Sequence, residues 1–479
     1  MRSGLLKDSS GSRDARPAGA SRTGAGRRRV VAAAPMLALA TLVSTAPAPA
    51  QEPEAASETS PVAFWRSMGD PTLERLIVRA LDANHDLRAA EARVREARST
   101  RSEAALDLAP RVTASAGYSR QRLSSLSLPG APGSLPDQSV WDAGVEMSWE
   151  LDVFGRLRHS LEGRSALVES ARRDTEDLRI LLAAEVARAY YDLRGAQDRL
   201  AVARRNAENQ RRTLGLTLDR LELGSGTALD TERARAQLSS TLAAIPSFET
   251  GVAAARHRIG VLLGRAPAAV EGELSTAMGS DPTLPELEVE DLAFIARRRP
   301  DVRSAERQVA AQDAFVGAAR ADYLPRLSID AVAGYTGGEL DGLVNSGTAR
   351  YAVGPVLSWP LFDLGRVKTR VDRARAAETR AAARYEQTIL RALEEAETSL
   401  AAYGNARERL RHLEDAAAAS ARATELARLR FEEGGTDFLE VLDAERRLLE
   451  AQDLLAAGRS EATGWLVSVY RALGGRVGS

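Results

Sequence analysis

Residue types that commonly carry chemistry are scarce in this sequence of 479 residues, and they are widely spaced. It contains no cysteine, which excludes disulfides, iron–sulfur clusters and thiolate metal sites. None of its four histidines has another histidine at i+3 to i+5, so we expect no His-based metal site; they are His85, His159, His257 and His412. Gly-x-Ser-x-Gly, phosphate-loop and His-Glu-x-x-His motifs are absent from the sequence. We therefore expect no enzymatic activity, no cofactor and no metal.

One group of residues with suggestive spacing lies near the C-terminal end. Leu439 and Asp443 are four residues apart and share one face of an expected helix, and Arg446 follows about one turn later. Repeated around an axis, they would form an apolar ring that seals by dewetting beside an acidic ring that favours cations. Arg446 could then pair with an acidic residue and hold the closed form. Spacing alone favours the simpler interpretation, in which Leu439 is coiled-coil core and Asp443 a solvated charge.

Composition predicts a folded, mainly helical chain. Hydrophobic residues make up 44% and charged residues 27%, whereas aromatic residues make up only 5%. Apolar content carried mainly by Ala and Leu is typical of long, Ala-packed helices. The formal net charge of −1 gives no reason to expect a nucleic-acid partner, because such proteins usually carry a basic stripe.

The first fifty residues resemble a secretory signal. Three arginines at 27–29 precede an apolar run at 30–43, and a small-residue stretch follows before Gln51. The run is too short and too weakly hydrophobic to favour a membrane-spanning helix. A disordered basic tail is the alternative. Without residues 1–50 the chain loses eight Lys/Arg and two Asp/Glu, which leaves 57 basic and 64 acidic residues and a net charge of −7. We expect an exported protein that begins with a periplasmic segment at 51–72.

An internal duplication organises the remaining residues. Three segments recur in the same order: 84–94 is similar to 299–309, 148–156 to 358–366, and 224–230 to 434–440. A period of 210 to 215 residues is too long for a solenoid repeat. The sequence therefore predicts two copies of one large unit, at 73–270 and 285–475.

Each unit combines short strands with helices. The first predicts a helix at 73–108 that Pro110 ends, then strands at 111–122 and 140–151 joined by a loop rich in Pro, Gly and Ser. The second predicts a helix closed by Pro325 and strands at 326–337 and 350–361. Ten to twelve residues is about the length of a tilted transmembrane β-strand.

A very long helix follows each strand pair, at 156–223 and 366–432. In the first, Leu193, Leu200, Ala207, Leu214 and Leu221 form a heptad seam. Roughly 65 residues at 1.5 Å each give a rod of about 100 Å. Glycines then reverse the chain into return helices at 229–263 and 437–473. A filamentous coiled coil would explain the rods but not the paired strands.

Four strands cannot close a membrane barrel, and an open edge in lipid leaves backbone groups unsatisfied. Two chains would give eight strands, a barrel filled by side chains, whereas three would give twelve, which can leave a lumen. We therefore expect a mainly α fold with a membrane β-barrel part that is completed by oligomerisation.

Residues 296–309 and 317–326 resemble the signature of the TolC-like outer-membrane efflux proteins, in the branch that serves resistance-nodulation-division (RND) pumps. The resemblance implies a homotrimer, with a twelve-stranded barrel in the outer membrane on an α-helical periplasmic tunnel. It implies two further partners, a periplasmic adaptor and an inner-membrane RND pump. The implied function is passive conduction of drugs, other small toxic solutes or metal ions to the exterior, although the five Met and dispersed His do not favour metal as cargo.

The resemblance also assigns residues. The family's periplasmic aperture matches Leu439 and Asp443, and Arg446 follows one turn further along the helix. Two similar tips are expected to dock the adaptor, although their glycines also serve simply to reverse the chain; they comprise Arg220, Gly224 and Gly226, and Arg430, Gly434 and Gly435. Aromatic residues in or beside the strands are candidates for membrane girdles, or ordinary strand aromatics: Tyr118, Trp141, Trp149, Tyr335, Tyr351 and Trp359.

One feature departs from this branch, many of whose members carry a lipid on an N-terminal Cys. Because the sequence has no Cys, we expect no lipid anchor, so that the barrel alone holds the protein in the membrane. Two alternatives stay open: the outer-membrane channel of a type I protein-secretion system, and a non-channel periplasmic coiled-coil scaffold.

Overall fold

The computed structural model describes residues 61–123, 136–270, 272, 274, 284–287 and 292–475. The chain forms two units, Met1–Glu58 and Thr59–Ser479, and the description concerns the second. The expected signal peptide at 1–50 and most of the loop between the first two strands lie outside the described residues.

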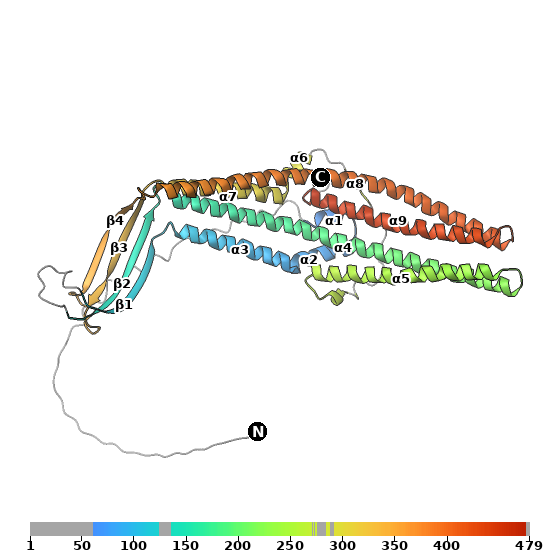
Figure 1. The fold of residues 1–479 in the computed structure, drawn as a ribbon, viewed down its shortest axis with the longest axis horizontal. Helices are drawn as coiled ribbons and strands as arrows, with labels where there is room; N and C mark the ends of the chain where they lie inside the picture. Colours follow the sequence, from blue (N-terminus) through green and yellow to red (C-terminus); the bar gives the residue numbers. More distant parts are fainter. Residues whose placement is uncertain are drawn as a thin grey trace, which may run out of the picture. The chain divides into compact units, whose positions relative to one another are not determined.

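Four antiparallel strands form one sheet in the order β1-β2-β3-β4 (Figure 1). They are β1 (Arg111–Gln121), β2 (Gln138–Leu151), β3 (Arg326–Gly337) and β4 (Ala349–Ser358). β4 ends three residues before the expected end at 361, because Trp359 is followed by Pro360, which has no N–H for the ladder. The two strand pairs, one from each repeat, thus join in a single sheet.

The helix expected at 73–108 is two helices, which corrects that prediction. α2 (Pro71–Ala83) ends and α3 (His85–Leu106) begins at Asn84, whose backbone is extended. The Asn84 side chain accepts hydrogen bonds from the N–H groups of Asp86 and Leu87, so it caps α3. The same break in the second repeat separates α6 (Leu292–Arg298) from α7 (Pro300–Ala321) at Arg299.

Two long helices leave the sheet and return as shorter ones (Figure 1). α4 (Arg156–Glu222) packs along α5 (Ala228–Leu262), and α8 (Leu364–Glu432) packs along α9 (Phe438–Ala472). Near the sheet the helices pack in the order α3, α4, α7, α8, each on the next. This row of four helices continues the four strands.

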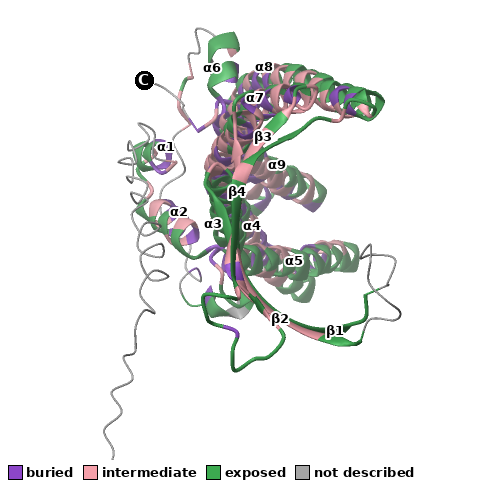
Figure 2. Cartoon of the chain, turned by 90° about the vertical axis from the view of Figure 1, so that its left-hand side faces the viewer, coloured by how far each residue is buried: buried purple, intermediate pink, exposed green. Residues whose placement is uncertain are grey.

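The largest buried cluster lies where a short N-terminal helix, α1 (Ala63–Ser67), and α2 meet α4, α5 and α9. Figure 2 shows α1 and α2 on one side of the row of helices. Trp65, fully buried, contacts the rings of Phe64 and Tyr470 at centroid distances of 4.8 Å. α1 falls within the segment expected at 51–72 and contributes to the core of both repeats. A short 3-10 helix, Pro267–Val270, packs on α5.

None of the helices in the described part of the chain has the length and apolar character that a membrane crossing requires.

Candidate functional site

The two faces of the sheet differ sharply in polarity. Residues paired across antiparallel strands point to the same face, so the register sorts the side chains. One face is wholly apolar or aromatic in its middle rows, such as Val112, Met147, Ala331 and Val353, and Leu151, Leu327 and Leu357. Several of these side chains are exposed, including Val353 at 69% and Leu357 at 66%. An exposed apolar face of this kind fits contact with lipid.

The opposite face is polar and carries its own hydrogen-bond network. Asp142 accepts hydrogen bonds from Thr336 at 2.6 Å and from Arg350 at 2.9 Å, which links β2, β3 and β4. Ser148 donates to Asp330 at 2.7 Å across β2 and β3. Apolar residues on one face and polar residues on the other match the alternation of a membrane barrel with a polar interior.

All five candidate girdle aromatics within the strands lie on the apolar face: Tyr118, Trp141, Trp149, Tyr335 and Tyr351. They fall in two groups along the strands. Tyr118 and Trp141 pair directly near the loop end, with ring centroids 4.6 Å apart. Trp149 lies eight residues further along β2, about 27 Å at 3.4 Å per residue, which matches the apolar band of about 25 Å.

The two tryptophans at the helix end are held in the same way. The Trp149 indole donates to the carbonyl of Leu108 at 2.9 Å, and the Trp359 indole donates to the carbonyl of Tyr323 at 3.0 Å. Each acceptor lies in the turn that follows α3 or α7. These bonds fix where each strand pair joins its helices.

Both outer strands have an unpaired edge within one chain. β1 is exposed throughout, and β4 is exposed at all but one position. Their outward N–H and C=O groups find no partner strand in the sheet, which has the order β1-β2-β3-β4. Such edges require pairing with another chain before the sheet can enter lipid.

The tips at the far ends of the helix pairs have similar backbones. Gly224 and Gly434 have φ values of 72° and 76°, a region that favours glycine. In both tips a glycine N–H closes the turn on an arginine carbonyl: Gly226 on Arg220 at 2.9 Å, and Gly435 on Arg430 at 2.7 Å. A Cβ on Gly226 would lie 3.0 Å from the Cβ of Arg220. The chain reversal alone therefore demands glycine at 224 and 434.

The two tip arginines differ. Arg220 lies 4.2 Å from the centre of the Phe431 ring and donates to the Phe431 carbonyl at 3.3 Å, so it joins the first tip to the second. Arg430 is exposed and forms no side-chain hydrogen bond or ion pair within the described residues. Of these two arginines, Arg430 is thus the one available to an external partner.

The candidate gate residues lie together on the first turns of α9. Leu439 is 50% exposed, so it is not part of the core of a single chain. Asp443 forms ion pairs with Arg446 at 3.0 Å and Arg447 at 2.8 Å on the same helix. The hydrogen bond from Arg446, aided by the charge of Arg447, lowers the pKa of Asp443 from its usual value. The carboxylate therefore stays ionised and screened by two cations.

A ladder of polar contacts joins α4 to the second helix pair, α8 and α9, and it was not predicted from the sequence. Arg199 binds Asp453 through two hydrogen bonds of 2.7 and 2.9 Å, Asn206 donates to Gln452 at 3.0 Å, and Thr213 donates to Glu445 at 2.9 Å. These α4 positions are seven residues apart, and Arg220 is the next member. Each directly precedes a residue of the apolar heptad seam, which was the signal available in the sequence.

Glu445 is the buried centre of this ladder. Its side chain is 4% exposed and also accepts two hydrogen bonds from Arg428, at 2.7 and 3.1 Å. Three helices, α4, α8 and α9, thus meet at one carboxylate two residues from Asp443. In the described part of the chain, no three His, Cys, Asp or Glu side chains come together in a way that could hold a metal ion.

The family model for the outer membrane efflux protein matches residues 76–265 and 295–475, one match for each repeat. The chain is 34% identical over 410 residues, 85% of its length, to the toluene efflux pump outer membrane protein TtgF of Pseudomonas putida, of which 84% is covered. The probable efflux pump outer membrane protein SepC of Pseudomonas putida has the same identity and coverage. This chain belongs to the outer membrane efflux protein family, a family of outer-membrane transport proteins.

Solved structures agree with this assignment. The outer-membrane channel OprN superposes with a TM-score of 0.81 at 40% sequence identity, over 88% of this chain and 93% of that chain. The fold described above is the fold of that channel.

Proposed function

We propose that the protein is the outer-membrane channel of a tripartite RND-type efflux system, built as a homotrimer. The open four-stranded sheet carries this proposal, because it has one apolar face, one polar face and two unpaired edges. Pairing β4 of each protomer with β1 of the next closes twelve strands, satisfies the edges and turns the polar face inward. The row of α3, α4, α7 and α8 then continues the barrel as a tunnel into the periplasm.

The cargo proposed is small organic solutes and drugs, which cross the channel passively while the pump supplies the energy. TtgF is named for toluene efflux, which supports this class. In this proposal Tyr118, Trp141, Tyr335 and Tyr351 form the outer girdle, and Trp149 and Trp359 the inner girdle. The tips receive the adaptor, with Arg430 as the cation open to it.

In the same proposal the gate is closed by contacts near the tips. Leu439 contributes the apolar ring and Asp443 the acidic ring, and Arg446 and Arg447 hold Asp443 in place. The ladder from Arg199 to Arg220 keeps the two helix pairs of each protomer together. Opening then requires the second pair to move away from α4, which breaks the ladder.

The first test is assembly and conductance of the full chain. Trimers in detergent and discrete channels in planar bilayers are expected, together with restored solute tolerance in cells that lack their own channel but retain an adaptor and pump. A monomer that stays in the soluble fraction and forms no channels would instead support a periplasmic scaffold. Restored secretion of a protein, without solute tolerance, would support a type I secretion channel.

The gate is tested by Leu439→Ala and Asp443→Asn, with Glu433→Gln as a matched control. Glu433 is exposed at the same tip and has no ion pair within the described residues. The gate variants are expected to raise the open probability in bilayers, and the control is expected to leave it unchanged. Wild-type closure in both gate variants would remove these residues from the gate.

A further inference from the structure

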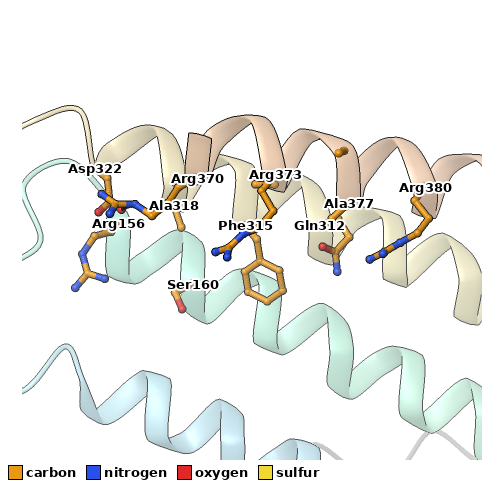
Figure 3. Close-up of a pocket in the computed structure, with 13 residues that line it drawn as sticks. Arg156, Ser160, Gln312, Phe315, Ala318, Asp322, Arg370, Arg373, Ala377 and Arg380 are labelled. Atoms are coloured by element: carbon orange, nitrogen blue, oxygen red, sulfur yellow. Dashed lines mark ion pairs between the residues drawn. The ribbon is translucent and has the colours of Figure 1, made fainter. Parts of the chain in front are cut away.

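An arginine stripe runs along one side of α8. It consists of Arg370, Arg373, Arg380, Arg384 and Arg391, whose spacing places them within about 80° of the helix circumference at 100° per residue. Figure 3 shows Arg370, Arg373 and Arg380 beside a groove of about 670 Å³ that α4, α7 and α8 share. Arg370 pairs with Asp322 at 3.2 Å. The other four are exposed and pair with no carboxylate in the described part of the chain.

Unpaired acids occupy one side of α3 in the same manner. Asp86, Glu96 and Glu103 are exposed and form no ion pair within the described residues. Their spacing of ten and seven residues places them within about 100° of arc. Arg93 and His85 are the basic residues on this side. α3 and α8 are the two ends of the row of helices, so within the described residues neither packs against a further helix of the row on its outer side.

The duplication supplies the template for what covers them. Within the chain, α7 packs against α4 through close contacts that can be read residue by residue. A Cβ on Gly163 would lie 2.5 Å from the Phe315 ring, and the hydroxyls of Ser170 and Ser304 are 2.9 Å apart. Further along, Asp174 of α4 and Asp301 of α7 line one groove, which Arg384 and Arg391 of α8 also border.

Repeat offsets transfer these contacts to the open ends of the row. Trp149 and Trp359 are 210 positions apart, which relates α4 to α8, and Asp86 and Asp301 are 215 apart, which relates α3 to α7. Adding 210 to Gly163 and subtracting 215 from Phe315 places Arg373 of α8 opposite Thr100 of a neighbouring α3. Glu96 and Glu103 lie one turn to either side of Thr100. The contact of Ser170 with Ser304 becomes Arg380 opposite Ala89. The positions equivalent to Asp174 and Asp301 are Arg384 and Asp86, which would therefore lie opposite each other.

We propose that α8 of one protomer recognises α3 of the next through this charge pairing, with Arg384 binding Asp86 and Arg373 lying between Glu96 and Glu103. The inference rests on the trimer proposed above and names the residues that select the partner. The internal contact between α4 and α7 brings together two acids, Asp174 and Asp301. The equivalent contact between chains would bring together residues of opposite charge, Arg384 and Asp86. Arg93 lies nearest Arg380 and opposes it, but the pairs of Arg384 with Asp86 and of Arg373 with Glu96 and Glu103 leave the balance in favour of attraction. Such pairing sets register and partner choice.

Charge reversal with rescue is the first test, and the readout is the trimer fraction of purified protein in detergent by light scattering. Arg384→Glu should lower association by about tenfold or more, and Asp86→Arg should do the same. The double variant, Arg384→Glu with Asp86→Arg, should recover most of the trimer. Arg375→Glu is the matched control, because Arg375 is exposed on α8, has no ion pair and lies two residues from Arg373 on another side. Circular dichroism of each variant checks that the helices form.

Disulfide trapping is the second test, and the absence of native cysteine removes its background. Ala89→Cys with Arg380→Cys should give covalent dimers and trimers on oxidation, whereas Ala89→Cys with Thr379→Cys should not. A monomeric wild type would overturn the proposed function itself. A trimeric wild type whose reversal variants also remain trimeric, or whose cysteine pair does not crosslink, would overturn only this inference. If such trimeric variants change the ion selectivity in bilayers, the arginines line the lumen instead.

Discussion

In both repeats, equivalent hydrogen bonds fix the joints at the two ends of the short helix, α3 or α7. The outward faces of the long helices differ between the repeats. In both, a tryptophan indole binds the carbonyl in the turn after the short helix: Trp149 to Leu108 and Trp359 to Tyr323. In both, the residue before that helix binds the last residue of the return helix. Asn84 donates to the Leu262 carbonyl at 3.0 Å, and Arg299 donates to the Ala472 carbonyl at 3.2 Å.

These acceptors are backbone carbonyls, which every residue supplies. The donor can therefore change from the amide of Asn84 to the guanidinium of Arg299 while the hydrogen bond is kept. Faces that meet a neighbouring helix obey a different rule, because there the side chains must match. On α4 the face is small, with Gly163 and Ser170 fitted to α7, whereas the matching positions on α8 are Arg373 and Arg380. In the trimer proposed above, this divergence between the copies marks the helix face whose partner differs.

The largest expected difference between the repeats concerns the hydrogen bond donated by the residue before the short helix, Asn84 or Arg299. Arg299 is 6% exposed and also pairs with Asp301 at 2.8 Å and Glu395 at 2.9 Å. Arg299→Ala strands these carboxylates, so we expect a loss of about 3 kcal/mol, toward the low end for a buried pair because both acids are partly exposed. Asn84→Ala removes a neutral cap and should cost about 1 kcal/mol. Denaturant midpoints measure both, and equal losses would show that the charges add nothing to the joint.

The next prediction compares a glycine on a helix face that packs against another helix, Gly163 of α4, with a glycine on an exposed helix face, Gly404 of α8. Gly163→Ala places a methyl group 2.5 Å from the Phe315 ring, and we expect a net loss of about 1 kcal/mol after the usual helix gain. Gly404→Ala, on exposed α8, meets nothing within 4 Å and should gain about 0.5–1 kcal/mol. Thermal midpoints should therefore move in opposite directions. A gain at both positions would mean that α7 yields easily to α4.

A smaller effect depends on pH and concerns Asp177 on α4, whose counterpart on α8 is the amide Gln387. Burial, reinforced by the charge of Asp301, raises the pKa of Asp177 to about 6. A raised pKa in the folded state means that stability present below about pH 4 is lost as pH rises through 6. Asp177→Asn should therefore stabilise the protein by about 1–2 kcal/mol at pH 7, allowing for solvent screening, and by almost nothing at pH 4. Urea midpoints at the two pH values decide it, and a gain that is equal at both would exclude the titration.

Elements that depend on local signals were predictable from the sequence. Prolines at 110 and 325 place the strand starts, and glycines at 224 and 434 place the chain reversals. The break at Asn84 was missed because the apolar pattern continues through it, although Asn is a frequent cap. The ladder from Arg199 to Arg220 could not be assigned, because its partners lie about 210 to 250 residues away and heptad spacing does not identify the neighbouring helix.

Similarity of sequence between the two tips likewise hid a difference in their contacts. Gly224 and Gly434 are required for the same backbone reason. The arginines before them share a spacing but not a role, since Arg220 packs on Phe431 and Arg430 extends into solvent. Spacing predicts backbone conformation well because the turn is local, whereas the ring that meets Arg220 comes from the other repeat.

The smallest effect tests this difference between the tips. Arg220→Ala removes a cation–π contact and a hydrogen bond, so we expect a loss of about 1 kcal/mol and faster amide exchange at 431–438. Arg430→Ala should change stability by less than about 0.5 kcal/mol, because the side chain has no partner within the described residues. If Arg430 docks the adaptor, this silent change should still weaken pump assembly in a pull-down, while Arg220→Ala loosens the tip first. Weakened assembly from Arg220→Ala alone would mean that the adaptor reads the shape that Arg220 maintains rather than the charge of Arg430.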